Sequence, residues 1–126
     1  MRAVDTNVLV RLIARDDVAQ AAAADEFVSR GAWISHLVLL ETVWVLDSIF
    51  SLAHTQIATA VEMLLNHRDL VVQDPDVVAA ALARFRKRSK VGFSDCMVLE
   101  VARKAGHLPL GTFDRHLAKL DGTELL

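Results

Sequence analysis

Short apolar runs alternate with amphipathic stretches along the whole chain. The runs at 2–5, 32–35, 70–72 and 108–112 have the length and the turn-forming borders of strands, and residues 124–126 provide a candidate fifth strand. Between these runs the apolar residues follow helical spacing. Strands that alternate with helices predict an α/β fold, with a mostly parallel central sheet of four to five strands flanked by helices.

Capping residues and helix breakers set the bounds of the expected helices. They cover residues 7–14, a stretch from Asp16 or Asp17 to about 30, 36–50, 54–66, a stretch from 76 into the basic residues at 84–90, 95–104, and 115–120. Ser35 and Ser94 are expected N-caps. Asp74-Pro75 is a strong start signal, and Gly106 is expected to end the helix before it.

Composition narrows the class of protein further. The 126 residues, 53% of them hydrophobic, predict a single domain over residues 1–126 with a substantial core. With a net charge of −2, any nucleic-acid contact must come from a local patch. The only cysteine, Cys96, excludes an internal disulfide and fits a reducing cytoplasm. No signal peptide is expected, and Glu41 and Asp47 interrupt the best candidate for a membrane span.

Four acidic residues stand in similar local settings although they lie far apart in the sequence. Asp5 follows the first strand and Asp114 follows the fourth. Asp95 lies in the first turn of a predicted helix, and Glu41 lies on the helix that follows the second strand. Each position has an ordinary explanation, because acids cap helix N-termini and glutamates are common on exposed helix faces. Their shared relation to one sheet edge instead suggests a common ligand site.

Such a cluster of carboxylates requires a cation. Like charges repel at short range, so the cluster persists only when it is protonated or neutralised. Ligands that are all oxygen favour a hard ion, Mg²⁺ or Mn²⁺. Because Mg²⁺ keeps several of its waters, one or two of the acids would bind the ion and the others would hold or activate metal-bound water.

Two motifs at the ends of the chain are informative together. The first is Asp5-Thr6-Asn7-Val8-Leu9 and the second is Thr112-Phe113-Asp114-Arg115-His116-Leu117. With Glu41 and Phe93-Ser94-Asp95, they make the chain resemble PIN-domain ribonucleases over its full length, and specifically the VapC-type toxins of VapBC toxin–antitoxin pairs.

The resemblance implies a PIN-like fold and a Mg²⁺- or Mn²⁺-dependent endoribonuclease. It implies that the catalytic and metal-binding residues are Asp5, Glu41, Asp95 and Asp114, supported by Thr6, Asn7, Ser94 and Thr112. In that site the metal would bind the scissile phosphate and lower the pKa of a bound water. Glu41 or Asp114 would accept the proton of that water.

Positive charge is concentrated shortly before Asp95. One explanation is compensation of a helix dipole on a solvated surface. The other is contact with RNA phosphates beside the acidic site. The expected RNA-binding residues are Arg86, Lys87, Arg88 and Lys90, which follow Arg84 in the same cluster.

Residues 43–50 are apolar on nearly all sides, which is typical either of a buried core helix or of an interface. The resemblance favours the interface, because similar toxins form homodimers and bind the C-terminal segment of an antitoxin in a groove of the third and fourth helices. A basic antitoxin residue would then occupy the acidic pocket. The expected contact residues are Trp44, Leu46 and Phe50, with Trp44 contributing most.

Other classes of function fit parts of the pattern. A catalytically silent PIN-like module that binds RNA or protein would have lost an acid, and all four are present. A dehalogenase-like phosphotransferase needs a second aspartate where Asn7 stands. A receiver domain could use Asp74 but lacks the paired early acids. Cys96 and the five histidines show neither zinc-site spacing nor a positioned catalytic base.

Overall fold

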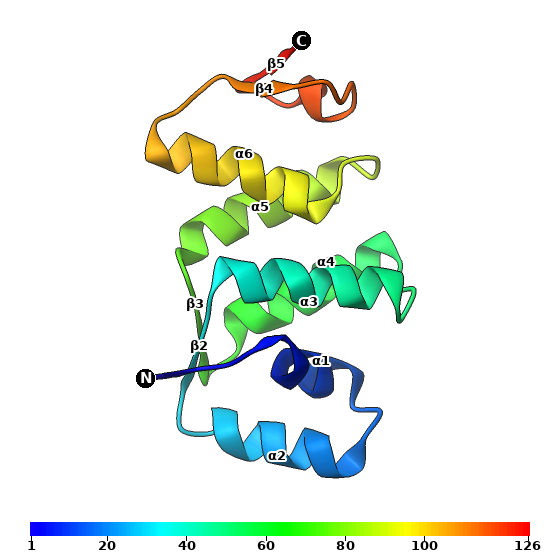
Figure 1. Ribbon diagram of the computed structural model, residues 1–126, viewed down its shortest axis with the longest axis vertical. Helices are drawn as coiled ribbons and strands as arrows, with labels where there is room; N and C mark the ends of the chain where they lie inside the picture. Colours follow the sequence, from blue (N-terminus) through cyan, green and yellow to red (C-terminus); the bar gives the residue numbers. More distant parts are fainter. The chain divides into compact units, whose positions relative to one another are not determined.

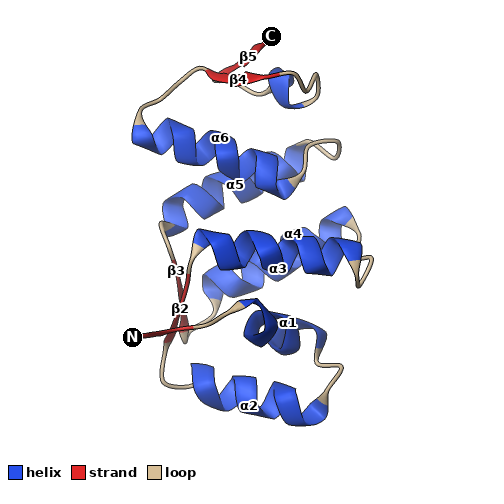
Figure 2. Ribbon diagram, viewed as in Figure 1, coloured by secondary structure: helices blue, strands red, loops and turns tan.

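Helices form most of the structure, and the strands are only two or three residues long (Figure 2). The computed structural model describes all 126 residues (Figure 1). Contacts divide the chain into two units, Met1–Pro75 and Asp76–Leu126. No helix in either unit is both long enough and apolar enough to cross a membrane.

The first unit contains a parallel sheet and four helices. Its elements are β1 (Arg2–Ala3), α1 (Thr6–Ala14), α2 (Val18–Val28), β2 (Ala32–Ile34), α3 (His36–Ser48), α4 (His54–Asn66) and β3 (Leu70–Val72). The strand order is β1-β2-β3, with Ala3 opposite Trp33 and Trp33 opposite Val71. Because the strands are parallel, β1 and β2 deliver the residues that follow them to the same edge of the sheet.

Side-chain caps begin three of these helices. Asp5, Asp17 and Ser35 accept hydrogen bonds from backbone amides in the first turns of α1, α2 and α3. The caps expected of Asp17 and Ser35 are therefore confirmed. The core beneath the helices consists of fully buried aliphatic side chains, among them Leu9, Ile34 and Leu39.

The second unit contains two α-helices and a small sheet. Its elements are α5 (Pro75–Lys87), α6 (Phe93–Ala105), β4 (Leu110–Thr112), the 3₁₀ helix η1 (Leu117–Lys119) and β5 (Thr123–Leu125). Phe85 of α5 packs edge-on against Phe93 of α6, with ring centroids 5.7 Å apart. Gly106, with a φ of 83°, ends α6 as expected.

Two expectations about this architecture are wrong. The five strands do not form one sheet of four to five strands; β1, β2 and β3 form one parallel sheet, and β4 and β5 form a second. Strands of two or three residues carry too little pattern to specify their partners. The N-cap of α6 is Gly92 rather than Ser94, because the helix already begins at the buried Phe93.

Candidate active site

Asp5 lies directly beyond β1 and caps α1. Its Oδ1 accepts a hydrogen bond from the backbone amide of Val8 at 3.3 Å. This bond satisfies one of the free amides at the helix N-terminus. The side chain is exposed, and its Oδ2 receives no hydrogen bond from the protein. Asp5 therefore combines a structural role with one carboxylate oxygen that a ligand can use.

Glu41 lies on an exposed face of α3, about one and a half turns from the start of the helix. α3 follows β2 directly, and β2 is the parallel neighbour of β1. Asp5 and the start of α3 consequently share one edge of the three-stranded sheet. Glu41 forms no ion pair, and its side chain is exposed to solvent.

Asp95 lies in the first turn of α6 and is only partly exposed. Its carboxylate has neither a hydrogen bond nor an ion pair with the protein. Burial, and after it the negative charge of Asp114, raises the pKa of Asp95 above its ordinary value. The structure therefore brings Asp95 and Asp114 close enough for their charges to interact.

Asp114 occupies the turn between β4 and η1. Its Oδ1 accepts hydrogen bonds from the backbone amides of His116, at 2.7 Å, and Leu117, at 3.1 Å. These bonds, from Leu117 and His116, hold the pKa of Asp114 below its ordinary value. The Thr112 hydroxyl accepts a hydrogen bond from the Asp114 amide at 3.0 Å, which fixes the backbone of the turn. Asp114 is thus a positioned anion whose Oδ2 remains without a protein donor.

The other residues expected to support the acids make no such contact. Thr6 is buried in the first turn of α1, Asn7 is exposed beside it, and Ser94 is exposed on α6. None of their side chains forms a hydrogen bond. Their supporting role stays a prediction.

Neither unit by itself holds three or more His, Cys, Asp or Glu side chains arranged around one metal position. Each unit instead supplies two acids: Asp5 and Glu41 in the first, Asp95 and Asp114 in the second. The expectation that all four act at one metal site stays a prediction.

The expected basic cluster continues into a pocket that the sequence did not reveal. Lys87, Arg88 and Lys90 line a hollow of about 210 Å³ together with His116 and Lys119. The two added residues lie in the segment that follows Asp114, and no local pattern links them to a cluster some 30 residues earlier. Arg84 lies outside this pocket and pairs with the buried Glu100 at 3.0 Å.

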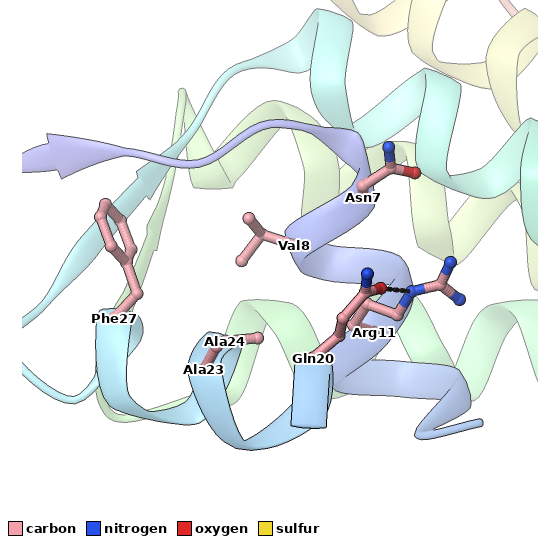
Figure 3. A pocket seen from close by; sticks show the side chains of 7 residues that line it. All are labelled: Asn7, Val8, Arg11, Gln20, Ala23, Ala24 and Phe27. Carbon is pink, nitrogen blue, oxygen red and sulfur yellow. Dashed lines mark hydrogen bonds between the residues drawn. The ribbon is translucent and has the colours of Figure 1, made fainter. Parts of the chain in front are cut away.

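A second pocket, of about 420 Å³, lies between α1 and α2 (Figure 3). Its lining residues are Asn7, Val8, Arg11, Gln20, Ala23, Ala24 and Phe27. Figure 3 shows Arg11 next to Gln20, whose Oε1 accepts its Nε–H at 2.6 Å. Arg11 also pairs with Asp16 at 2.8 Å. The one charged lining residue is therefore already engaged, and the remaining wall is mainly apolar.

The apolar part of α3 is divided between core and surface. Trp44 is 62% exposed, and Leu37, seven residues before it on the same helix face, is 81% exposed. Phe50 is partly exposed. Leu46 is 1% exposed and belongs to the core, so its expected contact with a partner does not fit this structure. Glu41 lies between Leu37 and Trp44 on the exposed face, at helical spacing.

Cys96 follows Asp95 but faces the interior. It is fully buried, and burial raises the pKa of its thiol to about 11. The thiol is therefore protonated at neutral pH and is not a nucleophile. This agrees with the sequence-based view of Cys96 as a small buried residue.

Comparisons with curated proteins and with solved structures gave no match. In the comparison with protein families, the PIN domain matches residues 2–123. The matched range spans both units and includes all four acids.

Proposed function

This chain belongs to the PIN domain family, whose members are generally metal-dependent nucleases, and we propose that it is a Mg²⁺- or Mn²⁺-dependent endoribonuclease that serves as the toxin of a type II toxin–antitoxin pair. The proposed catalytic and metal-binding residues are Asp5, Glu41, Asp95 and Asp114. Family membership over residues 2–123 supports this assignment.

The structural observation that best supports the proposal is the pair of Asp95 and Asp114. Asp95 and Asp114 interact as like charges, and no lysine or arginine forms an ion pair with either. A partly buried carboxylate without a donor is unfavourable unless something outside the protein neutralises it. A pair of this kind with free carboxylate oxygens suits a divalent cation that prefers oxygen ligands.

The residues present therefore fit a hard divalent metal. In the second unit, Asp95 and the Oδ2 atom of Asp114 are the groups that would hold it, since the Oδ1 atom of Asp114 already caps a helical turn. In the first unit, the Oδ2 atom of Asp5 is likewise left without a protein donor. When bound, such an ion supplies charge neutralisation at the scissile phosphate and a water with a lowered pKa.

The acid best suited to accept the proton of the attacking water is one whose carboxylate makes no other hydrogen bond or ion pair. Backbone hydrogen bonds from Leu117 and His116 lower the pKa of Asp114, which makes it a weaker proton acceptor. Glu41 is exposed and forms no ion pair. Of the two acceptors considered from the sequence, Glu41 is the better choice, and Asp114 is better suited to remain a permanent anion.

Recognition of RNA falls to the basic residues of the second unit. Arg86, Lys87, Arg88 and Lys90 lie at the end of α5 and in the loop that follows, and all are exposed. That loop leads directly into Gly92 and the first turn of α6, which carries Asp95. Phosphate contacts from the loop would hold the RNA backbone without reading its bases.

The toxin role requires a protein partner, and α3 offers a surface for one. Trp44 and Leu37 are large exposed apolar side chains on one helix face, and Phe50 follows at the end of the helix. An aromatic anchor of this kind commonly contributes much of an interface's energy. The surface would serve a homodimer or the C-terminal segment of the antitoxin, whose basic residue would reach the nearby Glu41.

Cleavage of a labelled structured-RNA pool tests the activity. Purified protein, free of any co-purified partner, is incubated with Mg²⁺, with Mn²⁺ and with EDTA, alongside Asp5→Asn. Metal-dependent cuts that disappear in EDTA and in the variant are expected. Cuts of equal strength in EDTA would contradict the metal requirement, and equal cutting by Asp5→Asn would contradict the site assignment.

A further inference from the structure

The basic pocket of the second unit is a concave site with a single sign of charge. It is built by Lys87 at the end of α5, by Arg88 and Lys90 from the loop after α5, and by His116 and Lys119 from the segment around η1. The remaining lining residues are one serine and one valine, so no acidic side chain opposes the positive charge. Its volume of about 210 Å³ is below that of sites for drug-sized ligands and suits a small anionic group.

Two segments distant in sequence have to meet to form this pocket. A solvated helix end with compensating charge would explain Lys87 and Arg88 alone. It does not explain why Lys119 and His116, about 30 residues later, converge on the same hollow. Convergence of like charges is unfavourable in the absence of an anion, so the arrangement indicates an anionic ligand.

Both segments that line the pocket lead along the chain to an acidic residue. The amide of His116 donates a hydrogen bond to Asp114 Oδ1 at 2.7 Å. Val91, in the other lining segment, precedes the Gly92 cap of the helix that carries Asp95. The pocket is thus tied through short backbone links to the interacting pair of Asp95 and Asp114.

We propose that this pocket is a phosphate subsite that holds one backbone phosphate of the RNA strand next to the phosphate being cleaved. The identity of the strand as RNA rests on the proposed function; the anionic ligand does not. Lys90 and Lys119 contact the phosphate from different segments, and His116 lines the same pocket while its amide bonds to Asp114. The subsite thereby sets which phosphodiester of a bound strand reaches the acidic residues.

Binding in EDTA tests the subsite without any requirement for cleavage. A short labelled oligouridine is titrated into wild-type protein and into the double variant Lys90→Gln/Lys119→Gln at several salt concentrations. The variant is expected to bind roughly ten-fold more weakly. Because a single phosphate is lost, the slope of log K against log salt is expected to become shallower by about 0.7.

The matched control removes the same charge elsewhere. Arg30 and Arg68 are exposed residues of the first unit and line no part of the basic pocket. The double variant Arg30→Gln/Arg68→Gln is expected to keep the wild-type salt slope. An equal loss of slope in this control would show that only total charge matters and would overturn the subsite.

A local readout separates the subsite from the nuclease activity. On addition of inorganic phosphate, the ring signals of His116, assigned with His116→Gln, are expected to shift in the wild type and not in Lys90→Gln/Lys119→Gln. Unmoved signals in wild-type protein that cleaves RNA would overturn the subsite alone. Shifted signals in protein that cleaves no RNA would support the phosphate site and contradict the proposed function.

Discussion

Asp95 at the start of α6 and Asp114 beyond β4 form a like-charged pair in which neither carboxylate makes an ion pair with a lysine or an arginine. The two residues respond in opposite ways to their surroundings. Burial and the charge of Asp114 raise the pKa of Asp95, whereas amide donors lower the pKa of Asp114. The protein therefore carries an unfavourable like-charge interaction that a divalent cation would relieve.

The first prediction concerns stability without metal. Ionised Asp95 disfavours folding, because its pKa is higher in the folded than in the unfolded chain. Asp95→Asn is therefore expected to raise Tm at pH 7 in EDTA, by a few degrees at most because the side chain is partly solvated. The gain is expected to disappear below about pH 4, where the carboxyl is protonated in both states. Thermal melting followed by circular dichroism measures it.

Asp76 provides a control of opposite sign. The hydrogen bond from Lys104 lowers the pKa of Asp76, so its ionised form stabilises the folded state at neutral pH. Asp76→Asn should lower Tm at pH 7, and this loss should fade as the pH falls through the folded pKa of Asp76. A fall in Tm for Asp95→Asn as well, in EDTA at pH 7, would contradict the strained pair.

The second prediction concerns the coupling itself. Asp114→Asn keeps an oxygen that can accept the amide hydrogen bonds of His116 and Leu117 but removes the charge. The pKa of Asp95 is expected to fall toward its ordinary value, because one of the two causes of its rise is gone. A pH titration of the Asp95 carboxyl carbon by NMR measures this change. Asp121→Asn, in the same unit, should leave the pKa of Asp95 unchanged. An equal fall of this pKa in Asp121→Asn would show that the charge of Asp114 does not specifically raise it.

The third prediction concerns the support of α6. The Glu100 carboxylate is 5% exposed and accepts hydrogen bonds from Arg84 at 3.0 Å and Arg103 at 3.2 Å. Arg103 also donates to the Asp121 carbonyl at 2.6 Å. Glu100→Gln leaves one guanidinium facing an amide donor and is expected to cost about 2 kcal/mol of unfolding free energy, between the values for exposed and buried pairs.

Urea denaturation measures the cost at Glu100. Glu124→Gln, an exposed residue without an ion pair, is the matched control and should change stability by less than about 0.5 kcal/mol. Equal stability of the two variants would mean that the buried carboxylate contributes little to holding α5 and α6 together.

The fourth prediction concerns the surface of α3. Trp44→Ala is expected to weaken self-association or antitoxin binding by about 30-fold, the effect of losing a large aromatic anchor. Sedimentation of the protein alone and with its co-expressed partner measures both. Val18→Ala, which removes an 85% exposed side chain from α2, is the control. Unchanged association in Trp44→Ala would exclude this face as the interface.

Local signals predicted the elements well and their assembly less well. β3 and α4 occupy the residues expected for them. The division of five strands into two sheets was not predictable, since it depends on tertiary pairing of very short strands. The start of α6 at Phe93 was missed because serine is the commoner cap and Gly92 takes the extended conformation that ends the preceding loop.

The candidate site shows the same limit. Asp114 was singled out because it follows a predicted strand and Asp95 because it lies in the first turn of a predicted helix, and the structure brings the two within electrostatic range. Lys119 and Lys90 line one pocket because two distant segments fold together, and no local sequence pattern predicts this. The sequence could not predict which face of α3 is buried either. Because this helix is apolar on nearly all sides, its pattern does not distinguish the exposed Trp44 from the buried Leu46.

The proposed metal site depends most on the interacting pair of Asp95 and Asp114, and Mn²⁺ tests this pair most directly. Bound Mn²⁺ broadens the NMR signals of nearby amides, so substoichiometric Mn²⁺ is added to labelled protein. The amides around Asp95 and Asp114 are expected to broaden first, and they are expected to stay sharp in Asp95→Asn. Amides around Asp95 and Asp114 that stay sharp in the wild type, or that broaden equally in the variant, would contradict a metal site at this pair.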